Sequence, residues 1–571
     1  MGWRLEILLD LSTNMLYYVD MYIARASWPS ANGKIYTSIY LRESYREGSR
    51  VRKRQIANLT HCDPQEVAAI ELALKYKGKL AALGSLDKIQ LRQGPSVGAV
   101  WTLCQVARRL GLERALGSRL AGQLALWQVL ARVLDQGSRL SAVRLAQLHA
   151  AGDVLGLRRG FDENDLYANL SWLSQQQPAI EQRLLAARRG AHKPELFLYD
   201  VTSSYLEGEQ NAYGDYGYAR DGKKGKKQII IGLLCDEQGE PVATEVFRGN
   251  TQDPQTFAAQ VQKASQRFGC QRVTFVGDRG MIKSAQVEEL SAAGFHYITA
   301  ITKPQIEALL GAGVLQMGLF DATLCEVQHA GLRYVLRRNP QRAAQLAAGR
   351  ADKQARLERL LQQWNRYLAE HPRARLATAE KALRAKIAQL KVERWLGVEA
   401  EGRSLRLTVD PAALEQVSRL DGCYVIKTDL PPSAASKQVV HDRYRDLAQV
   451  EQAFRICKTV HLETRPIHVR TAEHTRGHVL VVMLAYLLRR ELSRAWAALE
   501  VTVEEGLAQL QTLCSTEIHV EGGGSCLRIP QPSACARALL QALDLDLPPV
   551  LPHRETRVVT RKKLPARRKP R

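Results

Sequence analysis

The sequence has few of the features that mark disulfide-linked, zinc-bound or membrane proteins. Its ten cysteines are scattered and none forms a Cys-x-x-Cys pair, which argues against a zinc ribbon or a thioredoxin-type site and fits a reducing cytosol. No apolar run reaches the roughly 20 residues that a membrane span needs. The first twenty residues contain an Asp within their apolar stretch and no small-residue cleavage site, so they do not predict a signal peptide. We therefore expect a cytoplasmic protein with no membrane partner.

Acidic residues are also few relative to basic ones. The 571 residues include 58 Asp+Glu against 81 Lys+Arg, a formal net charge of +23. The length suggests about three or four folding units, and the charge favours a polyanionic partner, above all nucleic acid. A membrane surface, or solubility alone, is the alternative explanation of the charge.

The N-terminal part predicts a β-hairpin. Residues 34–58 alternate apolar and polar side chains on both sides of REGSR, with Gly48 in the expected turn. The second arm, Arg50 to Arg54, is a basic ribbon that either lies along a phosphate backbone or forms a solvated face.

Residues 64–190 predict a helical region. The first helix begins with the pair Asp63-Pro64, an N-cap followed by proline at the first helical position. Beyond it, apolar residues recur at three- and four-residue spacing. A small helical domain of this kind can carry a helix-turn-helix. The later helices are expected within 97–115, 119–135, 141–150 and 163–188.

From residue 195 the pattern changes to the order β-β-β-α-β-α-β, which predicts a mixed sheet with helices packed on it. Residues 303–420 break this pattern with a short β-like part and a long basic helical part, which His371-Pro372 divides into a hairpin. The core pattern then resumes with the strand GCYVIKT. We therefore expect 303–420 to be an insertion and the strands HYITAI and GCYVIKT to be neighbours in one sheet.

Three acidic residues stand out by position. Asp200 interrupts an apolar strand, Asp278 follows the strand VTFVG, and Glu451 lies in the helix after the resumed strand. Each alone could be a backbone hydrogen-bond partner, a helix cap or a solvent-facing residue. A carboxylate in an apolar strand is costly unless it is paired or bound to metal. Together the three favour convergence on hard cations such as Mg²⁺, two of which can support an in-line phosphoryl transfer.

Four segments carry a family resemblance: YDVTSSYLE at 199, YGYARDGKKGKKQIIIGLLCDEQGEPVATEVFRGNTQD at 216, VGDRGM at 276 and YRDLAQVEQAFRICK at 444. They resemble the ribonuclease-H-like catalytic domain of DDE transposases from bacterial insertion sequences, specifically the insertion-sequence-four superfamily. In the last segment Tyr444, Glu451 and Lys458 match the signature spacing of that superfamily, whereas Leu447 occupies its Arg position. Arg445 or Arg455 could supply the missing cation.

The resemblance implies a metal-dependent polynucleotidyl transferase and endonuclease. Asp200, Asp278 and Glu451 would be the catalytic residues and would bind two Mg²⁺ ions, with Mn²⁺ able to substitute. Water would cleave the DNA at the transposon end, and the freed 3′-hydroxyl would attack target DNA. Tyr444 and Lys458, each seven residues from Glu451 and expected on its face of one helix, would contact DNA beside the scissile bond. The implied partners are inverted-repeat ends, target DNA and a second copy of the chain, at the nucleoid of a bacterial cytoplasm.

Other basic residues have two interpretations. Arg279, beside Asp278, either holds a phosphate or pairs with a carboxylate. The loop ARDGKKGKKQ either tracks DNA or is simply solvated. His474 and His478 stand four apart on a helix but lack a third ligand with zinc-site spacing, so we expect ordinary helix residues. The lysines of the loop are Lys223, Lys224, Lys226 and Lys227.

Two alternative functions stay open. A ribonuclease-H-like nuclease without strand transfer would need neither the helical region nor the insertion, and a non-catalytic DNA-binding regulator would not need all three carboxylates. The expected fold is an α/β ribonuclease-H-like core, a mixed sheet flanked by helices, with a largely helical insertion, preceded by a β-hairpin and an all-α domain. The expected parts are a hairpin region (1–62), a helical DNA-binding domain (63–190), the core (191–302 and 421–500), the insertion (303–420) and a C-terminal region with a basic tail (501–571).

Overall fold

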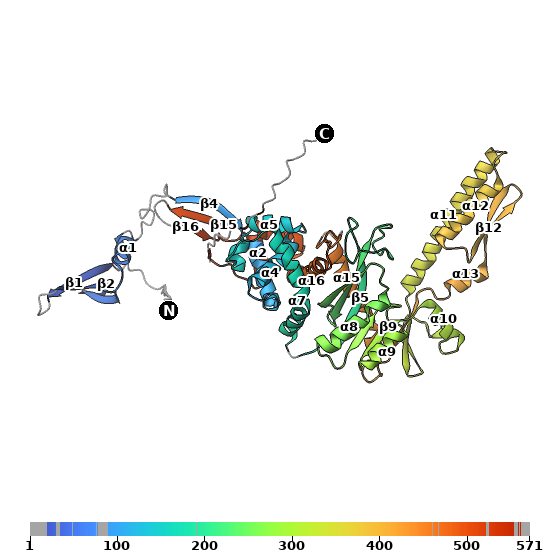
Figure 1. Ribbon diagram of the computed structural model, residues 1–571, viewed down its shortest axis with the longest axis horizontal. Helices are drawn as coiled ribbons and strands as arrows, with labels where there is room; N and C mark the ends of the chain where they lie inside the picture. Colours follow the sequence, from blue (N-terminus) through green and yellow to red (C-terminus); the bar gives the residue numbers. More distant parts are fainter. Residues whose placement is uncertain are drawn as a thin grey trace. The chain divides into compact units, whose positions relative to one another are not determined.

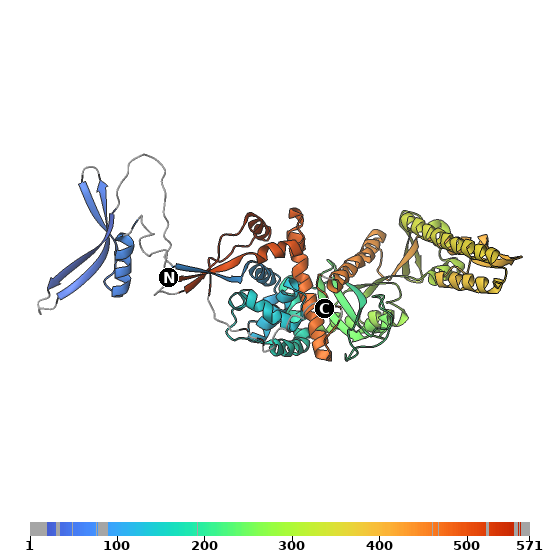
Figure 2. The ribbon, with the colours of Figure 1, turned by 90° about the horizontal axis from the view of Figure 1, so that it is seen from above.

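The chain divides by compactness into two units, each described here by itself (Figures 1 and 2). One comprises Met1–Gln93 with Thr516–Arg528, and the other comprises Gly94–Ser515 with Ile529–Arg571. The three acidic residues singled out in the sequence all belong to the second unit. The computed structural model describes residues 20–29, 35–47, 50–75, 77, 89–190, 192–459, 461–465, 467–520, 525–552, 558 and 560.

The first unit contains a three-stranded antiparallel sheet and a helix, namely β1 (Asp20–Pro29), β2 (Ile35–Glu47), β3 (Arg50–Asn58) and α1 (Pro64–Lys75). β2 and β3 form the expected hairpin, with Glu47 opposite Arg50; Gly48 lies outside the described residues. The sequence did not predict β1, which pairs with β2 along its length. The Gln65 N–H donates to Asp63 Oδ1 at 2.7 Å, so Asp63 caps α1 as expected.

The predicted helical region is interrupted by a strand, β4 (Ile89–Ser96). The Gly94-Pro95 pair within it opposes a helix, because proline pushes the preceding residue out of helical geometry. The sequence did not predict α6, whereas the other helices that follow overlap the predicted segments. These helices are α2 (Gly98–Arg109), α3 (Leu112–Leu116), α4 (Leu120–Leu134), α5 (Arg139–Leu148), α6 (Ala151–Leu155) and α7 (Glu163–Arg189).

A long apolar helix, α16 (Ala472–Ala495), packs on α4 and α7. A Cβ atom at Gly477 would lie 2.2 Å from the Leu170 carbonyl oxygen, so glycine is what allows α16 to approach α7 this closely. α16 also contacts the sheet of the same unit through β7. No described helix has the length and apolarity of a membrane span.

An eight-stranded mixed sheet has the order β10-β11-β14-β9-β8-β5-β6-β7. β5, β8 and β9 run parallel, and all other neighbours pair antiparallel. Ile426 of β14 lies opposite Ala300 of β9, which confirms the predicted pairing of GCYVIKT with HYITAI. The strands are β5 (Leu196–Tyr205), β6 (Gln228–Asp236), β7 (Pro241–Arg248), β8 (Thr274–Gly277), β9 (His296–Ala300), β10 (Cys325–His329), β11 (Leu332–Arg338) and β14 (Cys423–Thr428).

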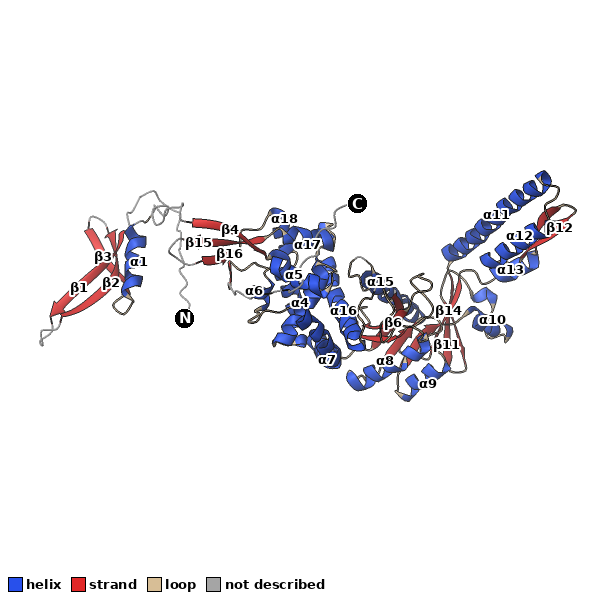
Figure 3. Cartoon of the chain, turned by 45° about the horizontal axis from the view of Figure 1, so that its top comes forward, coloured by secondary structure: helices blue, strands red, loops and turns tan. Residues whose placement is uncertain are grey.

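The insertion departs from the sheet later than expected. The β-like part of 303–420 is a hairpin, β10–β11, that extends the sheet, with Val335 of β11 opposite Ile426 of β14. The excursion consists of α11 (Pro340–Glu370), α12 (Leu376–Leu390), β12 (Leu396–Glu401), β13 (Ser404–Val409) and α13 (Pro411–Ser418). Figure 3 shows α11 and α12 side by side beyond β11 and β14. The excursion has a small hydrophobic core of its own, in which Leu357, Leu383 and Trp395 are buried.

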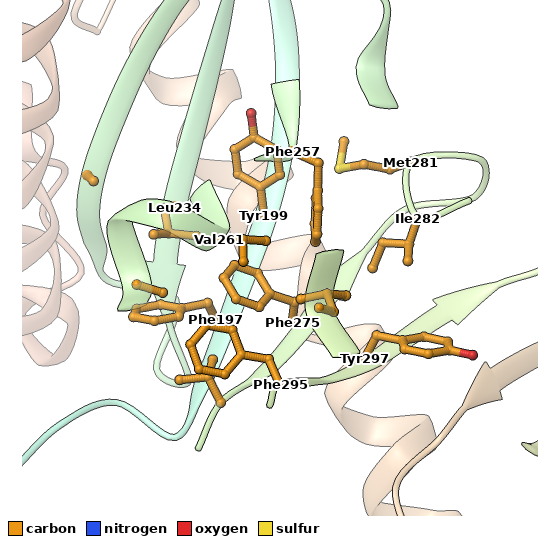
Figure 4. Close-up of a cluster of buried hydrophobic side chains, with 14 of the residues drawn as sticks. Phe197, Tyr199, Leu234, Phe257, Val261, Phe275, Met281, Ile282, Phe295 and Tyr297 are labelled. Carbon is orange, nitrogen blue, oxygen red and sulfur yellow. The ribbon is translucent and has the colours of Figure 1, made fainter. Parts of the chain in front are cut away.

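β5 divides its side chains between two packed faces. Phe197 and Tyr199 point into an aromatic core with Phe257 and Phe275 (Figure 4), and Val201 belongs to the same core. Helices α8 (Ala258–Gln262) and α9 (Ser284–Ala292) follow β7 and β8 on this side. A 3₁₀ turn that begins at Asp253 precedes α8, and a π turn follows it. Because strand side chains alternate, Asp200 and Thr202 point to the opposite face.

The remaining described elements are α10 (Lys303–Gly311), α14 (Lys437–Arg445), α15 (Leu447–Lys458), α17 (Val503–Gln511), β15 (Cys514–Val520), β16 (Ser525–Arg528), α18 (Ala534–Gln541) and β17 (Val550–Leu551). Most of the basic C-terminal tail lies outside the described residues.

Candidate active site

Two of the three predicted carboxylates are adjacent because of strand register. In the parallel pair β5–β8, Leu196 is opposite Thr274 and Tyr199 is opposite Gly277. β8 ends at Gly277, so the next position along this register brings Asp200 and Asp278 together. Asp278 then begins a tight turn, closed by the Met281 N–H donating to the Asp278 carbonyl oxygen at 3.1 Å. The third residue of this turn is Gly280 with φ of +83°, a conformation that favours glycine.

Glu451 comes from α15, which packs on the Asp200 face of β5. Lys458, at the end of α15, donates from Nζ to Thr202 Oγ1 at 2.8 Å and so fixes the helix to this face. Two cavities of about 500 and 520 Å³ open here, and both are lined by Asp200, Asp278 and Glu451. The structure therefore brings the three predicted carboxylates to one place.

The electrostatics of Asp200 reflect this grouping. Burial, assisted by the negative charges of Asp278 and Glu451, raises the pKa of Asp200 to about 7 against the opposing effect of a hydrogen bond from the Val201 N–H. Asp278 and Glu451 are exposed, whereas Asp200 is half-buried. The site concentrates negative charge around one poorly hydrated carboxylate.

Asp200, Asp278 and Glu451 line the same two cavities, but they do not form a compact cluster of metal ligands. Among the described residues, no three His, Cys, Asp or Glu side chains stand close enough together to hold one metal ion. The donor chemistry nevertheless fits a divalent cation of the Mg²⁺ type, which prefers oxygen ligands and uses few protein carboxylates. Added positive charge would relieve the repulsion that raises the pKa of Asp200.

Tyr444 reaches the site from a different helix than expected. It lies on α14, whereas Glu451 lies on α15, and the two helices are separated at Asp446. The Tyr444 hydroxyl donates to Asp278 Oδ1 at 3.2 Å. Burial, followed by the charge of Asp278, raises the pKa of Tyr444, so the hydroxyl keeps its proton. The prediction that Tyr444 shares one helix with Glu451 was wrong, whereas Lys458 does lie on α15 with Glu451. The placement of Tyr444 beside the carboxylates comes from the turn between the two helices.

Lys458 is held by a residue that the sequence interpretation missed. Asp221, whose side chain is 3% exposed, forms ion pairs with Lys458 at 2.5 Å and Arg465 at 2.7 Å. Burial lowers the pKa of Lys458, and the hydrogen bond and charge of Asp221 oppose that effect. Lys458 thus has two protein partners, Thr202 and Asp221. The available signal was an acid within the basic loop ARDGKKGKKQ.

Basic side chains line both cavities. Arg279 lines both, while Arg445 lines the first and Arg455 the second. Leu447, which occupies the Arg position of the signature, is buried at the wall of the first cavity. Each cavity therefore has arginines beside the carboxylates, although the cationic position of the signature is apolar.

A second ion pair was also missed in the sequence. Arg220 pairs with Asp253, and both residues line the second cavity. The Arg220 N–H donates to Ser203 Oγ at 3.0 Å, which attaches this loop to β5.

The four lysines of the loop stand apart from the two cavities. Lys223, Lys224 and Lys226 are exposed, and Lys227 is half-buried. Lys223 lies 5.9 Å from the centroid of the Tyr205 ring, and Lys227 lies 5.8 Å from that of Tyr216. Lys226 pairs with Glu207 at 3.5 Å. The loop therefore presents a basic surface next to β5 and β6 and contributes none of these lysines to the described walls of the two cavities.

His474 and His478 face different surroundings on α16. His478 is buried and its Nδ1 accepts a hydrogen bond of 2.9 Å from Arg139, while His474 lies 5.7 Å from the ring of Tyr167. Burial, with the nearby arginines, lowers the pKa of His478 well below its usual range. The two histidines belong to the packing of α16 against the helical region.

Comparison with known proteins assigns the class. Residues 191–488 match the family described as "Transposase DDE domain", which is more than half of the chain. The protein therefore belongs to the family of transposases that carry a DDE domain. Residues 29–90 match the family described as "IS1634 family transposase, N-terminal domain". This match supports an insertion-sequence transposase but names a family other than the insertion-sequence-four superfamily, which is not confirmed.

Several chains of solved structures also match, among them one described as "Cryo-EM structure of piggyBac transposase synaptic complex with hairpin DNA". The TM-score is 0.32 at 8% sequence identity, covering 78% of this chain and 75% of that chain. No curated protein matches.

Proposed function

We propose that this transposase cleaves DNA at the ends of an insertion sequence and joins the freed 3′ ends to target DNA. The observation that carries the proposal is the meeting of Asp200, Asp278 and Glu451 at the same two cavities, from a strand, a strand end and a helix. Three carboxylates brought together from separated segments repel one another and so do not stabilise the fold. Their grouping is therefore better explained by function than by structure.

The sheet order supports a ribonuclease-H-like core. β7, β6 and β5 form an antiparallel meander, and β8 and β9 continue it in parallel with β5. α15 packs on the β5 face opposite the aromatic core. In this proposal β14 and β11 extend the core sheet, and the excursion from α11 to α13 is the insertion. The spacing of Tyr444, Glu451 and Lys458 supports the insertion-sequence-four superfamily as the wider relationship.

The carboxylates of Asp200, Asp278 and Glu451 would hold two Mg²⁺ ions, with Mn²⁺ able to substitute. When bound, such ions stabilise charge on the attacking and leaving oxygens of a phosphoryl transfer. The roles of the other residues follow from their contacts. Tyr444 holds the Asp278 carboxylate through its hydroxyl. Arg279, exposed beside Asp278 and lining both cavities, can pair with a DNA phosphate.

Lys458 is better suited to positioning than to direct DNA contact, because Thr202 and Asp221 already engage its ammonium group. In this proposal Arg445 and Arg455, exposed on α14 and α15, take over the phosphate contacts that the signature assigns to its Arg. The reaction breaks a P–O bond by attack of water and frees a 3′-hydroxyl, which then attacks a phosphodiester of the target.

The proposed partner is DNA, both the inverted-repeat ends and the target. The net charge of +23 favours it, because lysines and arginines that neutralise phosphates release bound counterions. Cutting and joining two ends also requires two active sites, so we propose that a homodimer acts on the DNA, at the nucleoid.

The test is cleavage of a labelled transposon-end duplex by the purified protein with Mg²⁺ or Mn²⁺, followed by joining to a plasmid. Asp200→Asn, Asp278→Asn and Glu451→Gln should each lower cleavage at least 100-fold and leave DNA affinity within about twofold, because the acids serve chemistry and the basic surface serves binding. Asp352→Asn, an exposed acid on α11, is the matched control.

The outcomes of this test separate the alternatives. Cleavage without joining would favour a nuclease. Sequence-specific binding with no cleavage by the wild type would favour a regulator. Full activity of any of the three carboxylate variants would contradict the assigned site.

A further inference from the structure

A third cavity lies away from the carboxylates, between the helical region and α16. It has a volume of about 560 Å³ and is lined from α4, the turn after it, the start of α5, and the segment that leads into α16. We call it the arginine cavity. The lining residues that matter for its chemistry are Arg132, Arg139, Glu463, His468, Arg470 and His478.

Two buried guanidinium groups form its inner wall. Arg132 and Arg139 are each 5% exposed, and charged side chains are rarely buried unless they are paired. Arg132 donates to the carbonyl oxygens of Gln136 and Gly137, but its buried Nε has no partner in the described structure. Arg139 donates to His478, a neutral partner. The hydrogen-bond partners of these two arginines are therefore uncharged, and the acids whose charges act on Arg132 are Asp135 and Glu463.

The charge balance of the arginine cavity favours an anion. Arg470 and His468 are exposed at its rim, and Glu463, also exposed, is the one acid among its lining residues. Burial, together with the positive charge of Arg132, lowers the pKa of Arg139 to about 9. The two guanidiniums repel each other, Asp135 and Glu463 offset burial only at Arg132, and a bound anion would relieve the repulsion.

Two helix N-termini also open into this cavity. Ser138 is the N-cap of α5, a helix of ten residues, and Thr471 is the N-cap of α16, a helix of 24 residues. Both caps line the cavity. The positive end of a helix dipole attracts phosphate groups. Donors that converge from two arginines and two helices suit a tetrahedral group with acceptor oxygens on every side.

We propose that the arginine cavity is a binding site for a phosphate group. Its volume of about 560 Å³ is much larger than one phosphate ion, which favours a phosphodiester with its sugars, as in a DNA strand; that source rests on the proposed function. The segment 461–471 connects this site to the active site. Arg465 of this segment lines the second catalytic cavity, whereas Glu463 and His468 line the arginine cavity. A DNA strand bound in the arginine cavity would therefore contact the same connection between α15 and α16 that contributes Arg465 to the second catalytic cavity.

Calorimetric titration of the full-length protein with inorganic phosphate, in chloride buffer without DNA, tests the site. Arg470→Ala and Arg139→Lys should each weaken phosphate binding roughly tenfold or more, the size of one charge-assisted hydrogen bond. Arg139→Lys keeps the charge but loses the planar fork. The matched control is Arg158→Ala, which removes an exposed arginine of the same unit outside this cavity and should bind as the wild type does. Wild-type melting temperatures of the variants would show that they fold.

Titration of a labelled duplex at several salt concentrations distinguishes the two sources of phosphate. If DNA is the ligand, both variants lower DNA affinity, Arg470→Ala reduces the salt slope by about 0.9, and inorganic phosphate competes. If free phosphate is the ligand, DNA binding is unchanged while phosphate binding is lost. Wild-type affinity of both variants for both probes would overturn the site. Phosphate binding can be measured without DNA cleavage. The binding experiments on the arginine cavity and the cleavage assay of the proposed function can therefore fail independently.

Discussion

The Tyr444 hydroxyl donates a hydrogen bond to Asp278 Oδ1 at 3.2 Å, across 166 positions of the chain. The first residue belongs to α14, which follows the insertion, and the second follows β8, which precedes it. This contact therefore exists only because the chain returns to the same sheet after its long excursion. It links a carboxylate of the candidate site directly to the segment that carries the family signature.

We predict that Tyr444→Phe lowers the rate of DNA cleavage by about 10- to 100-fold, because one hydrogen bond to a charged group contributes roughly 1.5–3 kcal/mol and each 1.4 kcal/mol is about a factor of ten in rate. The phenyl ring keeps the packing, so the free energy of unfolding should change little. Single-turnover cleavage of a labelled duplex gives the rate. Tyr367→Phe, at an exposed tyrosine of α11, serves as the control. An unchanged cleavage rate for Tyr444→Phe would show that the hydroxyl does not orient Asp278 during the reaction.

The lysine loop gives a prediction about binding alone. Replacing Lys223, Lys224, Lys226 and Lys227 by Ala should weaken binding of end DNA and lower the salt slope by as much as about 3–4, if all four contact phosphates. The pairing of Lys226 with Glu207 makes a smaller change the expected result. Metal binding at Asp200 should not change. Fluorescence anisotropy at several salt concentrations measures the slope, and a wild-type slope would place the DNA path elsewhere.

Asp221 should be a determinant of stability next to the active site. Asp221→Asn removes the buried partner of Lys458 and Arg465. Breaking a buried ion pair from one side typically costs about 3–5 kcal/mol, because the other charge stays buried without compensation. Urea unfolding followed by circular dichroism measures the loss. The double variant Asp221→Asn/Lys458→Met should recover part of it, and a loss equal to the sum of the two single variants would mean that the two residues are not coupled.

Glu504 predicts an acid-dependent loss of stability. Burial opposes its charge, but hydrogen bonds from Arg489 and His461 outweigh burial and lower the pKa of Glu504 from 4.5 to about 2. The unfolded chain then takes up the proton first, so this contribution is present above pH 4.5 and is lost as the pH falls toward 2. Thermal unfolding of the wild type and of Glu504→Gln between these pH values tests it. The difference between the two proteins should shrink as the pH falls; a constant difference would contradict the assignment.

The sequence by itself determined the order of helices and strands in the core and the positions of the three acids. Both are local properties: side-chain alternation marks a strand, and an acid inside or after an apolar strand is visible in its neighbours. The pairing of HYITAI with GCYVIKT was also predictable. The strand and helix pattern of the core stops at the insertion and resumes after it, which indicates that both parts belong to one sheet.

The tertiary structure decided the contacts between distant segments. The β10–β11 hairpin could have been part of the insertion, and only its pairing with β14 assigns it to the sheet. The burial of Asp221 against Lys458 depends on a loop folding over the end of α15, and no local pattern reports that. The arginine cavity likewise forms where α4, α5 and α16 meet. Local sequence fixes which groups a segment carries, whereas packing fixes which of them share a desolvated space and therefore which charges interact strongly.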